Sequence, residues 1–196
     1  MIYQRIQAKN GLKGKPMSEF DSQYLIGDWV VHYAYGIGQI KKIEQKPIHG
    51  EPQDCFQVTT QNGADWWFPK YGADNPRVRP VATKEKLQCA LDEFEKIVLD
   101  LNPDKNLWKG RMDEVMKSGD LIETVQIMRD LTVLQTQRKF NQMETKAFAL
   151  FKDRLLREWS AVMNINIAKI EPKLKRYLRV CKEGAIANNP SKTETQ

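Results

Sequence analysis

The chain of 196 residues has little of the chemistry on which most enzymes rely. It has two histidines, His32 and His49, and neither belongs to a metalloprotease, nucleophile-elbow or phosphate-loop motif. The segment Gly36-Ile37-Gly38 matches only half of a dinucleotide fingerprint and opens a β-rich run, so a tight turn and a bulge explain its glycines better. We therefore expect no catalysis, no cofactor and no small-molecule substrate.

Cysteines and long apolar runs are also scarce. Cys55, Cys89 and Cys181 are far apart, odd in number and outside any metal-ligand spacing, which is typical of reduced, mostly buried thiols. Charged residues interrupt every apolar run well before the length that a bilayer requires. The N-terminus lacks the apolar stretch of a secretory signal. These absences predict a cytoplasmic protein with no metal site and no membrane contact.

Positive charge, by contrast, is abundant. The formal net charge is +6, which favours a polyanionic partner. The excess is strongest in residues 169–182, where Glu171 is the only acid. A solvated helix face is one explanation, and contact with nucleic acid is another. The possible nucleic-acid contacts in this segment are Lys173, Lys175, Arg176 and Arg179.

The first half of the chain has the pattern of a small β module. Residues 1–22 show no sustained period and are predicted to be a flexible leader. Short β-rich runs then alternate with turn residues, and Asn62-Gly63 is a strong hairpin signal. Closely spaced short strands of this kind predict an SH3-like or Tudor-like barrel over residues 23–82. The predicted strands are residues 29–33, 37–43, 53–60, 65–68 and 78–81.

The second half is helical. Apolar residues at helical spacing predict a first helix over residues 84–101 and a short one from about Trp108 to Gly119. Capping boxes at Asp120 and Asn141 start two more, over roughly 120–138 and 142–163. Pro172 is expected to interrupt the last helical pattern. The sequence thus predicts an α+β protein: a β module, a helical domain over residues 83–183 and a disordered tail over 184–196.

Two tryptophans in the β module are candidate contact residues. Trp66 and Trp67 are adjacent in a predicted strand, so their indoles point to opposite faces of the sheet. One of them can fill the core. The other is either a partner contact or packs against residues 84–100.

The segment Trp108-Lys109-Gly110-Arg111 is the main candidate in the helical half. A large aromatic side chain near a helix start, with cations one and three residues later, suits a wedge against a nucleic-acid duplex. A tryptophan at a helix start is often a core residue as well, and this segment alone leaves both readings open.

Taken together, the two halves resemble the CarD-like bacterial transcription regulators. The similarity covers about residues 25–160 in the same order, so the basic segment at 169–182 lies outside the part that matches well. The residues that carry it are Leu25 to Ile40, Ile43-Glu44, Ile48 to Gly50, Pro69, Val78 to Val81, Trp108, Arg111, Ser118 to Asp120, Val125, Arg129 to Leu131, Glu144, Leu155 and Glu158.

This resemblance implies two contacts. The Tudor-like module of the family binds the β subunit of RNA polymerase, and its helical module touches promoter DNA at the upstream edge of the melted bubble. The resemblance assigns a minor-groove wedge to Trp108 and DNA-backbone contacts to Lys109 and Arg111. Lys46 stands where a basic polymerase contact is usual, and Trp67 replaces a polymerase-contacting arginine. The expected function is stabilisation of the open promoter complex.

Two alternatives remain at this point. The first is a protein-interaction adaptor whose barrel binds RNA polymerase while its helices never meet DNA. The second is a Tudor-like reader of RNA or a modified peptide, with an aromatic cage built from Trp29, Tyr33, Trp66 and Trp67.

Overall fold

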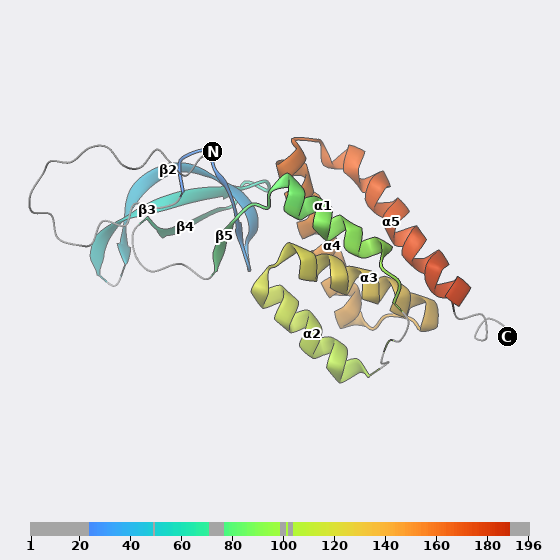
Figure 1. The fold of residues 1–196 in the computed structure, drawn as a ribbon. Coiled ribbons are helices and arrows are strands. Elements are labelled where there is room, and N and C mark those ends of the chain that lie inside the picture. The colour runs from blue at the N-terminus through green and yellow to red at the C-terminus, as the bar shows by residue number, and fades with distance from the viewer. Residues whose placement is uncertain (1–23, 49, 71–76, 99–100, 102–103, 189–196) are drawn as a thin grey trace, which may run out of the picture.

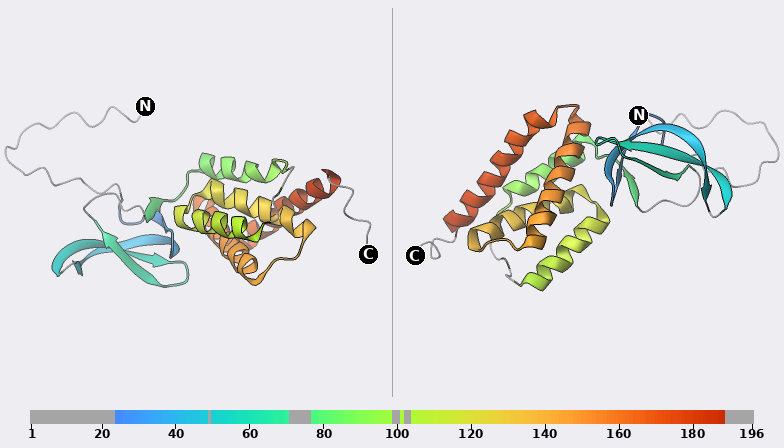
Figure 2. Two further views of the ribbon diagram at one scale, coloured as in Figure 1. Left: turned by 90° about the horizontal axis from the view of Figure 1, so that it is seen from below. Right: turned by 180° about the vertical axis from the view of Figure 1, so that it is seen from behind.

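The computed structural model describes residues 24–48, 50–70, 77–98, 101 and 104–188. An antiparallel sheet lies beside a group of helices, and both further views show the same arrangement (Figures 1 and 2). The predicted fold class, a Tudor-like β module followed by a helical module, is confirmed. The predicted leader at 1–22 lies outside the described residues.

The β module is one five-stranded antiparallel sheet in the order β4-β3-β2-β1-β5. Every β-rich run of the sequence forms a strand, but β2 continues to Ile48 because it pairs with β3 as far as the Ile48–Glu51 pair. Strand β4 lies at one edge of the sheet. The strands are β1 (Trp29–His32), β2 (Gly36–Ile48), β3 (Glu51–Thr60), β4 (Asp65–Pro69) and β5 (Val78–Pro80).

The two adjacent tryptophans separate as the strand period requires. Trp66 is 6% exposed and packs in the β core, whereas Trp67 is 40% exposed on the opposite face of β4. The expectation that one indole fills the core is confirmed. Because the two rings lie on opposite faces, Trp66 and Trp67 do not line a common aromatic cage.

The paired glycines have different roles. Gly36 adopts a φ of +74° at the turn between β1 and β2, so the predicted tight turn is present. Gly38 permits a close approach instead, because a Cβ there would lie 2.5 Å from Val58 Cγ1 and 2.9 Å from the Thr59 carbonyl oxygen. The β-bulge lies further along β2, between Ile40 and Lys42, so its predicted position was wrong.

The helical module contains α1 (Lys84–Asp92), the 3-10 helix η1 (Glu93–Glu95), α2 (Lys105–Ser118), α3 (Leu121–Gln137), α4 (Gln142–Met163) and α5 (Ile167–Asn188). Helix α3 packs against the other four α-helices. The capping box at Asn141 is complete, whereas Asp120 caps α3 without the reciprocal bond, because Glu123 accepts from Ser118 Oγ instead.

Both ends of this module differ from the sequence prediction. The first helix was predicted to reach residue 101, but it is α-helical only to Asp92. A 3-10 turn follows, and at Lys96 the backbone adopts an extended conformation. Helix α5 continues through Pro172, where one backbone hydrogen bond is lost, and the residues on either side of it, Ile170 and Leu174, are buried in the helical core. Helix α5 also passes Gly184 and ends at Asn188, so the predicted tail began too early. In the described ranges, no helix has the length and apolar character to cross a membrane.

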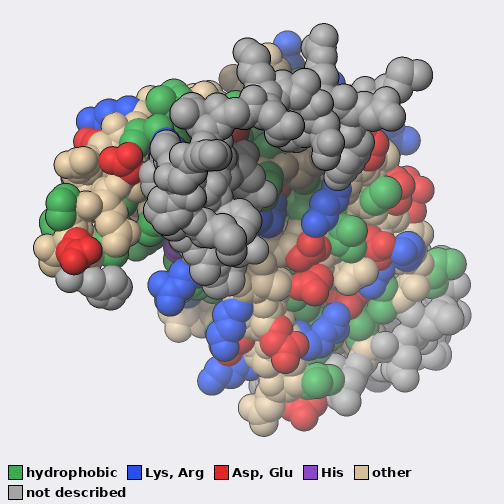
Figure 3. Space-filling model, turned by 60° about the vertical axis from the view of Figure 1, so that its left-hand side comes forward, with side chains coloured by type: hydrophobic (Ala, Val, Ile, Leu, Met, Phe, Trp, Pro, Cys, Tyr) green, Lys and Arg blue, Asp and Glu red, His purple; other side chains and the backbone are tan. Residues whose placement is uncertain are grey.

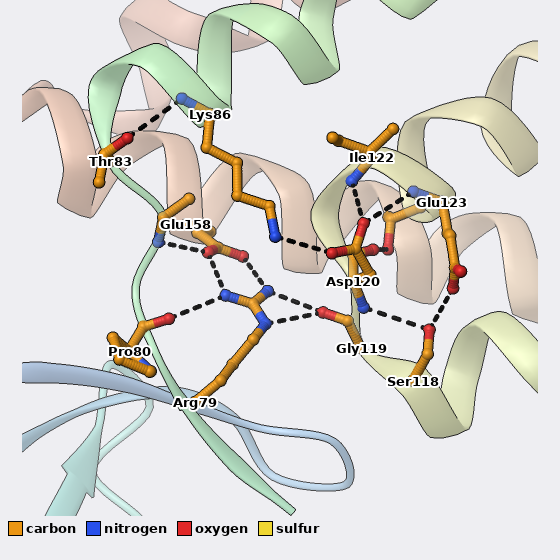
Figure 4. A network of polar contacts seen from close by, with 12 residues as sticks. Arg79, Pro80, Thr83, Lys86, Ser118, Gly119, Asp120, Ile122, Glu123 and Glu158 are labelled. Carbon is orange, nitrogen blue, oxygen red and sulfur yellow. Dashed lines mark hydrogen bonds and ion pairs between the residues drawn. The ribbon is translucent and has the colours of Figure 1, made fainter.

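An ion pair between the partly exposed Arg79 and the buried Glu158 joins the two modules (Figure 4). The Arg79 guanidinium on β5 bonds both carboxylate oxygens of Glu158 on α4, at 2.7 and 2.8 Å. The same guanidinium donates to the carbonyl of Gly119, the C-cap residue that follows α2. Glu158 also accepts from the backbone N–H of Ala82, and Lys86 pairs with Asp120 at 2.7 Å. The sheet, the end of α2 and α4 are therefore fastened at one point.

Two further contacts tie loops of the sheet to α4. Arg154 Nη2 donates to the carbonyl of Tyr33, in the β1–β2 turn, at 2.6 Å. Arg157 Nη1 donates to the Gln61 side chain, in the β3–β4 loop, at 3.3 Å. Two loops and one strand of the sheet thus contact the same helix, which holds the modules in one orientation.

Candidate interaction surfaces

The outer face of the sheet carries an aromatic and charged cluster, which we call the Trp67 cluster: Lys42, Glu44, Lys46 and Trp67. The ammonium group of Lys46 lies 4.3 Å from the centre of the Trp67 ring. The indole N–H donates to Glu44 Oε1 at 2.6 Å. Glu44 also pairs with Lys46 at 3.0 Å and with Lys42 at 2.8 Å. Lys46 and Trp67, chosen separately from the sequence, therefore lie in contact.

Glu44 belongs to the residues that carry the family resemblance, but it was not predicted to be a contact residue. Hydrogen bonds from Lys42 and Lys46 lower the pKa of its carboxyl group to about 2, so the side chain is an anion at neutral pH. Its position two residues before Lys46 on β2 puts both side chains on one face. This spacing could have linked Glu44 to Lys46 from the sequence. The contact of Glu44 with Trp67 could not be predicted in this way, because Trp67 lies on a different strand, β4.

The Trp67 cluster lies beside an edge of the sheet. Strand β4, which carries Trp67, pairs with β3 along one side and has no neighbouring strand along the other in the described part of the chain. An edge strand offers backbone N–H and C=O groups to an added strand. The combination of an exposed indole with an edge strand suits a protein partner.

Trp108 does not have the exposed position that the minor-groove wedge implied by the resemblance requires. Its side chain is 1% exposed and belongs to the core of the helical module. Helix α2 starts at Lys105, earlier than predicted, so Trp108, Met112 and Val115 form one apolar stripe at i, i+4 and i+7. This stripe faces the other helices, and the expectation of an exposed ring was wrong.

The exposed apolar residue at the start of α2 is Leu107, at 46% exposure. It lies about 100° around the helix from Trp108, which turns it away from the core. Arg111 is one turn beyond Leu107 on the same side, whereas Lys109 is exposed at the other edge of the helix surface. Leu107 was missed from the sequence because the start of α2 was placed at Trp108 instead of Lys105.

Arg111 is partly committed to the fold. Its guanidinium carbon lies 4.8 Å from the centre of the Trp108 ring, and Nη2 pairs with Asp130 on α3 at 2.8 Å. Asp130 is buried and also pairs with Arg129, which in turn bonds the buried Glu93. The Arg111 side chain is still 38% exposed. It can therefore cover the indole and present positive charge to solvent.

The basic residues of α5 are exposed but do not form one uniform surface. Lys175 lies 3.9 Å from Glu171, and Arg179 lies 3.6 Å from Glu183. Lys173 and Arg176 instead line a groove against α1 and α4. Figure 3 shows a face on which Lys and Arg side chains alternate with Asp and Glu over the helical part.

His32 stabilises the turn between β1 and β2. Its Nδ1 accepts from the backbone N–H groups of Ala34 and Tyr35 at 3.0 and 3.1 Å, which shapes the β1–β2 turn. Burial, together with the positive charges of Arg77 and Arg154, lowers the pKa of His32, so the ring is neutral at pH 7. The other histidine, His49, lies outside the described residues.

Comparisons with known proteins agree with this two-module structure. The family described as "CarD-like/TRCF RID domain" matches residues 24–82, and the family described as "CarD, C-terminal domain" matches residues 101–175. The chain is also similar to a Bacillus subtilis (strain 168) protein named "Putative transcription factor YdeB". The two are 25% identical over 150 residues, which cover 76% of this chain and 97% of that protein.

Proposed function

The chain belongs to the CarD-like family of transcription regulators, which act on RNA polymerase, and on this basis we propose that it binds the polymerase β subunit through residues 24–82. We further propose that its helical module touches promoter DNA at the upstream edge of the melted bubble. It acts in the cytoplasm by binding and without catalysis.

The observation that carries the polymerase contact is the Trp67 cluster. Tryptophan is a common energetic centre of protein interfaces. Here the indole is 40% exposed, yet Glu44 and Lys46 hold its orientation through a 2.6 Å hydrogen bond and a cation–π contact. Because the ring is ordered before binding, less side-chain entropy is lost when a partner covers it. The edge strand β4 adds backbone groups for pairing with a polymerase strand.

The junction between the modules supports a linked second contact. Arg79, Glu158 and the Gly119 carbonyl hold the sheet against the end of α2. A polymerase-bound sheet would therefore present α2 in a defined position. A DNA contact made there costs less entropy than one made through a flexible linker.

For the DNA contact we propose the first turns of α2. Leu107 is the apolar side chain available there, with Arg111 one turn away and Lys109 across the exposed face, while Trp108 supports the helix from within. An apolar wedge costs a few kcal/mol per base step in intact duplex and less at a fork that is already open. Such a contact would bind the open state better, and only differential affinity can shift the promoter equilibrium.

The polymerase contact is tested by co-purification of the full chain with core RNA polymerase. Trp67→Ala and Lys46→Glu are expected to weaken binding at least about tenfold, by about 1.4 kcal/mol or more. Lys41→Glu is the matched control, since Lys41 lies on the same strand and bonds Gln39 instead of the cluster. Equal binding of the polymerase by all three variants would show that the Trp67 cluster is not part of the interface.

A second candidate function is favoured by the burial of Trp108, which leaves no exposed tryptophan on α2. It is a polymerase adaptor whose helices never meet DNA. A footprint of the upstream fork separates the two: protection that depends on Leu107 supports the regulator, and polymerase binding without any protection supports the adaptor.

A further inference from the structure

A groove of about 520 Å³ runs between α1 and α5 and is closed by the C-terminal part of α4. It lies in the helical module, and none of its lining residues belongs to the sheet or to α2. Neither contact proposed above uses it. Its floor is apolar and its rim is mostly cationic.

The floor consists of Leu87, Leu91 and Trp159, which are 2%, 3% and 6% exposed. Two apolar side chains higher on the walls are much more accessible: Met163 is 39% exposed and Val180 is 45% exposed. Apolar groups this exposed around a recess are typical of a binding groove. Covering them would remove apolar surface from water, which favours association.

The rim carries the charge that selects a partner. Lys173 and Arg176 are exposed on α5, and Val180 follows on the same face of that helix at i+7 from Lys173. Lys84, at the start of α1, adds a third cation, whereas Glu95 is the one acidic side chain that lines the groove. The recess therefore combines an apolar floor with an excess of positive charge.

We propose that this groove binds an acidic amphipathic helix of a partner protein. An apolar helix face would fill the recess while carboxylates on its flanks meet Lys84, Lys173 and Arg176, which is the helix-in-groove mode of recognition. Helix α1 has nine residues and is about 13 Å long, which matches two to three turns of a bound helix.

The shape and lining favour a peptide over nucleic acid. A duplex presents phosphates on a convex surface and gains nothing from the apolar lining of the groove, such as Leu87, Leu91 and Val180. The experiment must therefore distinguish binding of an acidic peptide from binding of nucleic acid by the same cations.

The probe is a fluorescent 15-residue peptide with leucine at helical spacing on one face and glutamate elsewhere, and its control has lysine in place of every glutamate. Anisotropy with the full chain is expected to show binding of the acidic peptide only. Lys173→Glu combined with Arg176→Glu should weaken binding at least about tenfold. The matched control, Lys175→Glu with Lys182→Glu, makes the same charge change on α5 outside the groove.

The apolar floor is tested with Val180→Ser, which leaves the charge unchanged and alters a half-exposed side chain. It should weaken binding about threefold or more, while circular dichroism verifies folding of every variant. Equal binding of both peptides, or equal losses in the groove and control pairs, would overturn the proposal. The proposal would also be overturned if the wild type did not bind the acidic peptide and the Lys173→Glu, Arg176→Glu variant instead lost affinity for a DNA duplex.

Discussion

Replacement of Trp108 by alanine is expected to damage stability first. The indole is 1% exposed in the helical core, where Met112 packs beside it and Arg111 covers one face. Removal of a buried large aromatic side chain costs about 3–5 kcal/mol, because apolar contacts are lost and a cavity remains. In a protein of this size, each kcal/mol lowers Tm by about 2–4 °C, so the expected loss is about 6–20 °C.

The measurement is urea and thermal unfolding followed by circular dichroism, with Leu107→Ala as a matched control on the neighbouring residue. Leu107 is 46% exposed, so its truncation should change the free energy of unfolding by less than about 0.5 kcal/mol. The same control should shorten the lifetime of the open promoter complex if α2 meets DNA as proposed. The two adjacent variants thus separate a core role from a contact role.

One result would refute this reasoning about Trp108. If Trp108→Ala unfolds within about 1 kcal/mol of the wild type and still shortens the open-complex lifetime, the indole leaves the core when it acts. That result would support Trp108 as the wedge and would contradict the role proposed for Leu107.

Three further predictions concern the sheet and the junction. Gly38→Ala should cost about 1–3 kcal/mol in unfolding experiments, because its Cβ would lie 2.5 Å from Val58 Cγ1; an unchanged urea midpoint would contradict the packing argument. Arg79→Ala should cost about 2–4 kcal/mol by leaving the buried Glu158 unpaired, and adding Glu158→Gln should recover part of that loss. His32 has a lowered pKa, so stability should be full above its ordinary pKa of 6.5 and fall as the pH drops towards the folded-state pKa. His32→Gln should flatten that pH dependence of the urea midpoint, and an equally steep profile would assign it to other groups.

Strand positions were predictable because the local pattern and the tertiary environment agree. Alternation separates Trp66 from Trp67 whatever the partner strands are, and the Asn141 capping box begins α4 where the sequence placed it. The prediction at Pro172 was wrong because α5 is held in the core by buried neighbours such as Ile170 and Leu174, and their packing is seen only in the tertiary structure.

The candidate sites depended more on the fold. The resemblance pointed to Arg79, Gly119 and Glu158 as separate motif residues, and the structure brings them together at the junction of the modules. Lys46 and Trp67 come from different strands, so their contact follows from strand pairing, which short-range patterns do not specify.

By itself, the sequence determined the order of the two modules, their β and helical character and the family resemblance, since these depend on residue types and periods along the chain. Only the tertiary structure decided which face of α2 is buried, and so that Leu107 is exposed while Trp108 is enclosed. Burial is settled by the neighbours that a side chain meets. For α2 those neighbours include α3, which follows it in the sequence, and this packing chooses between two adjacent apolar residues.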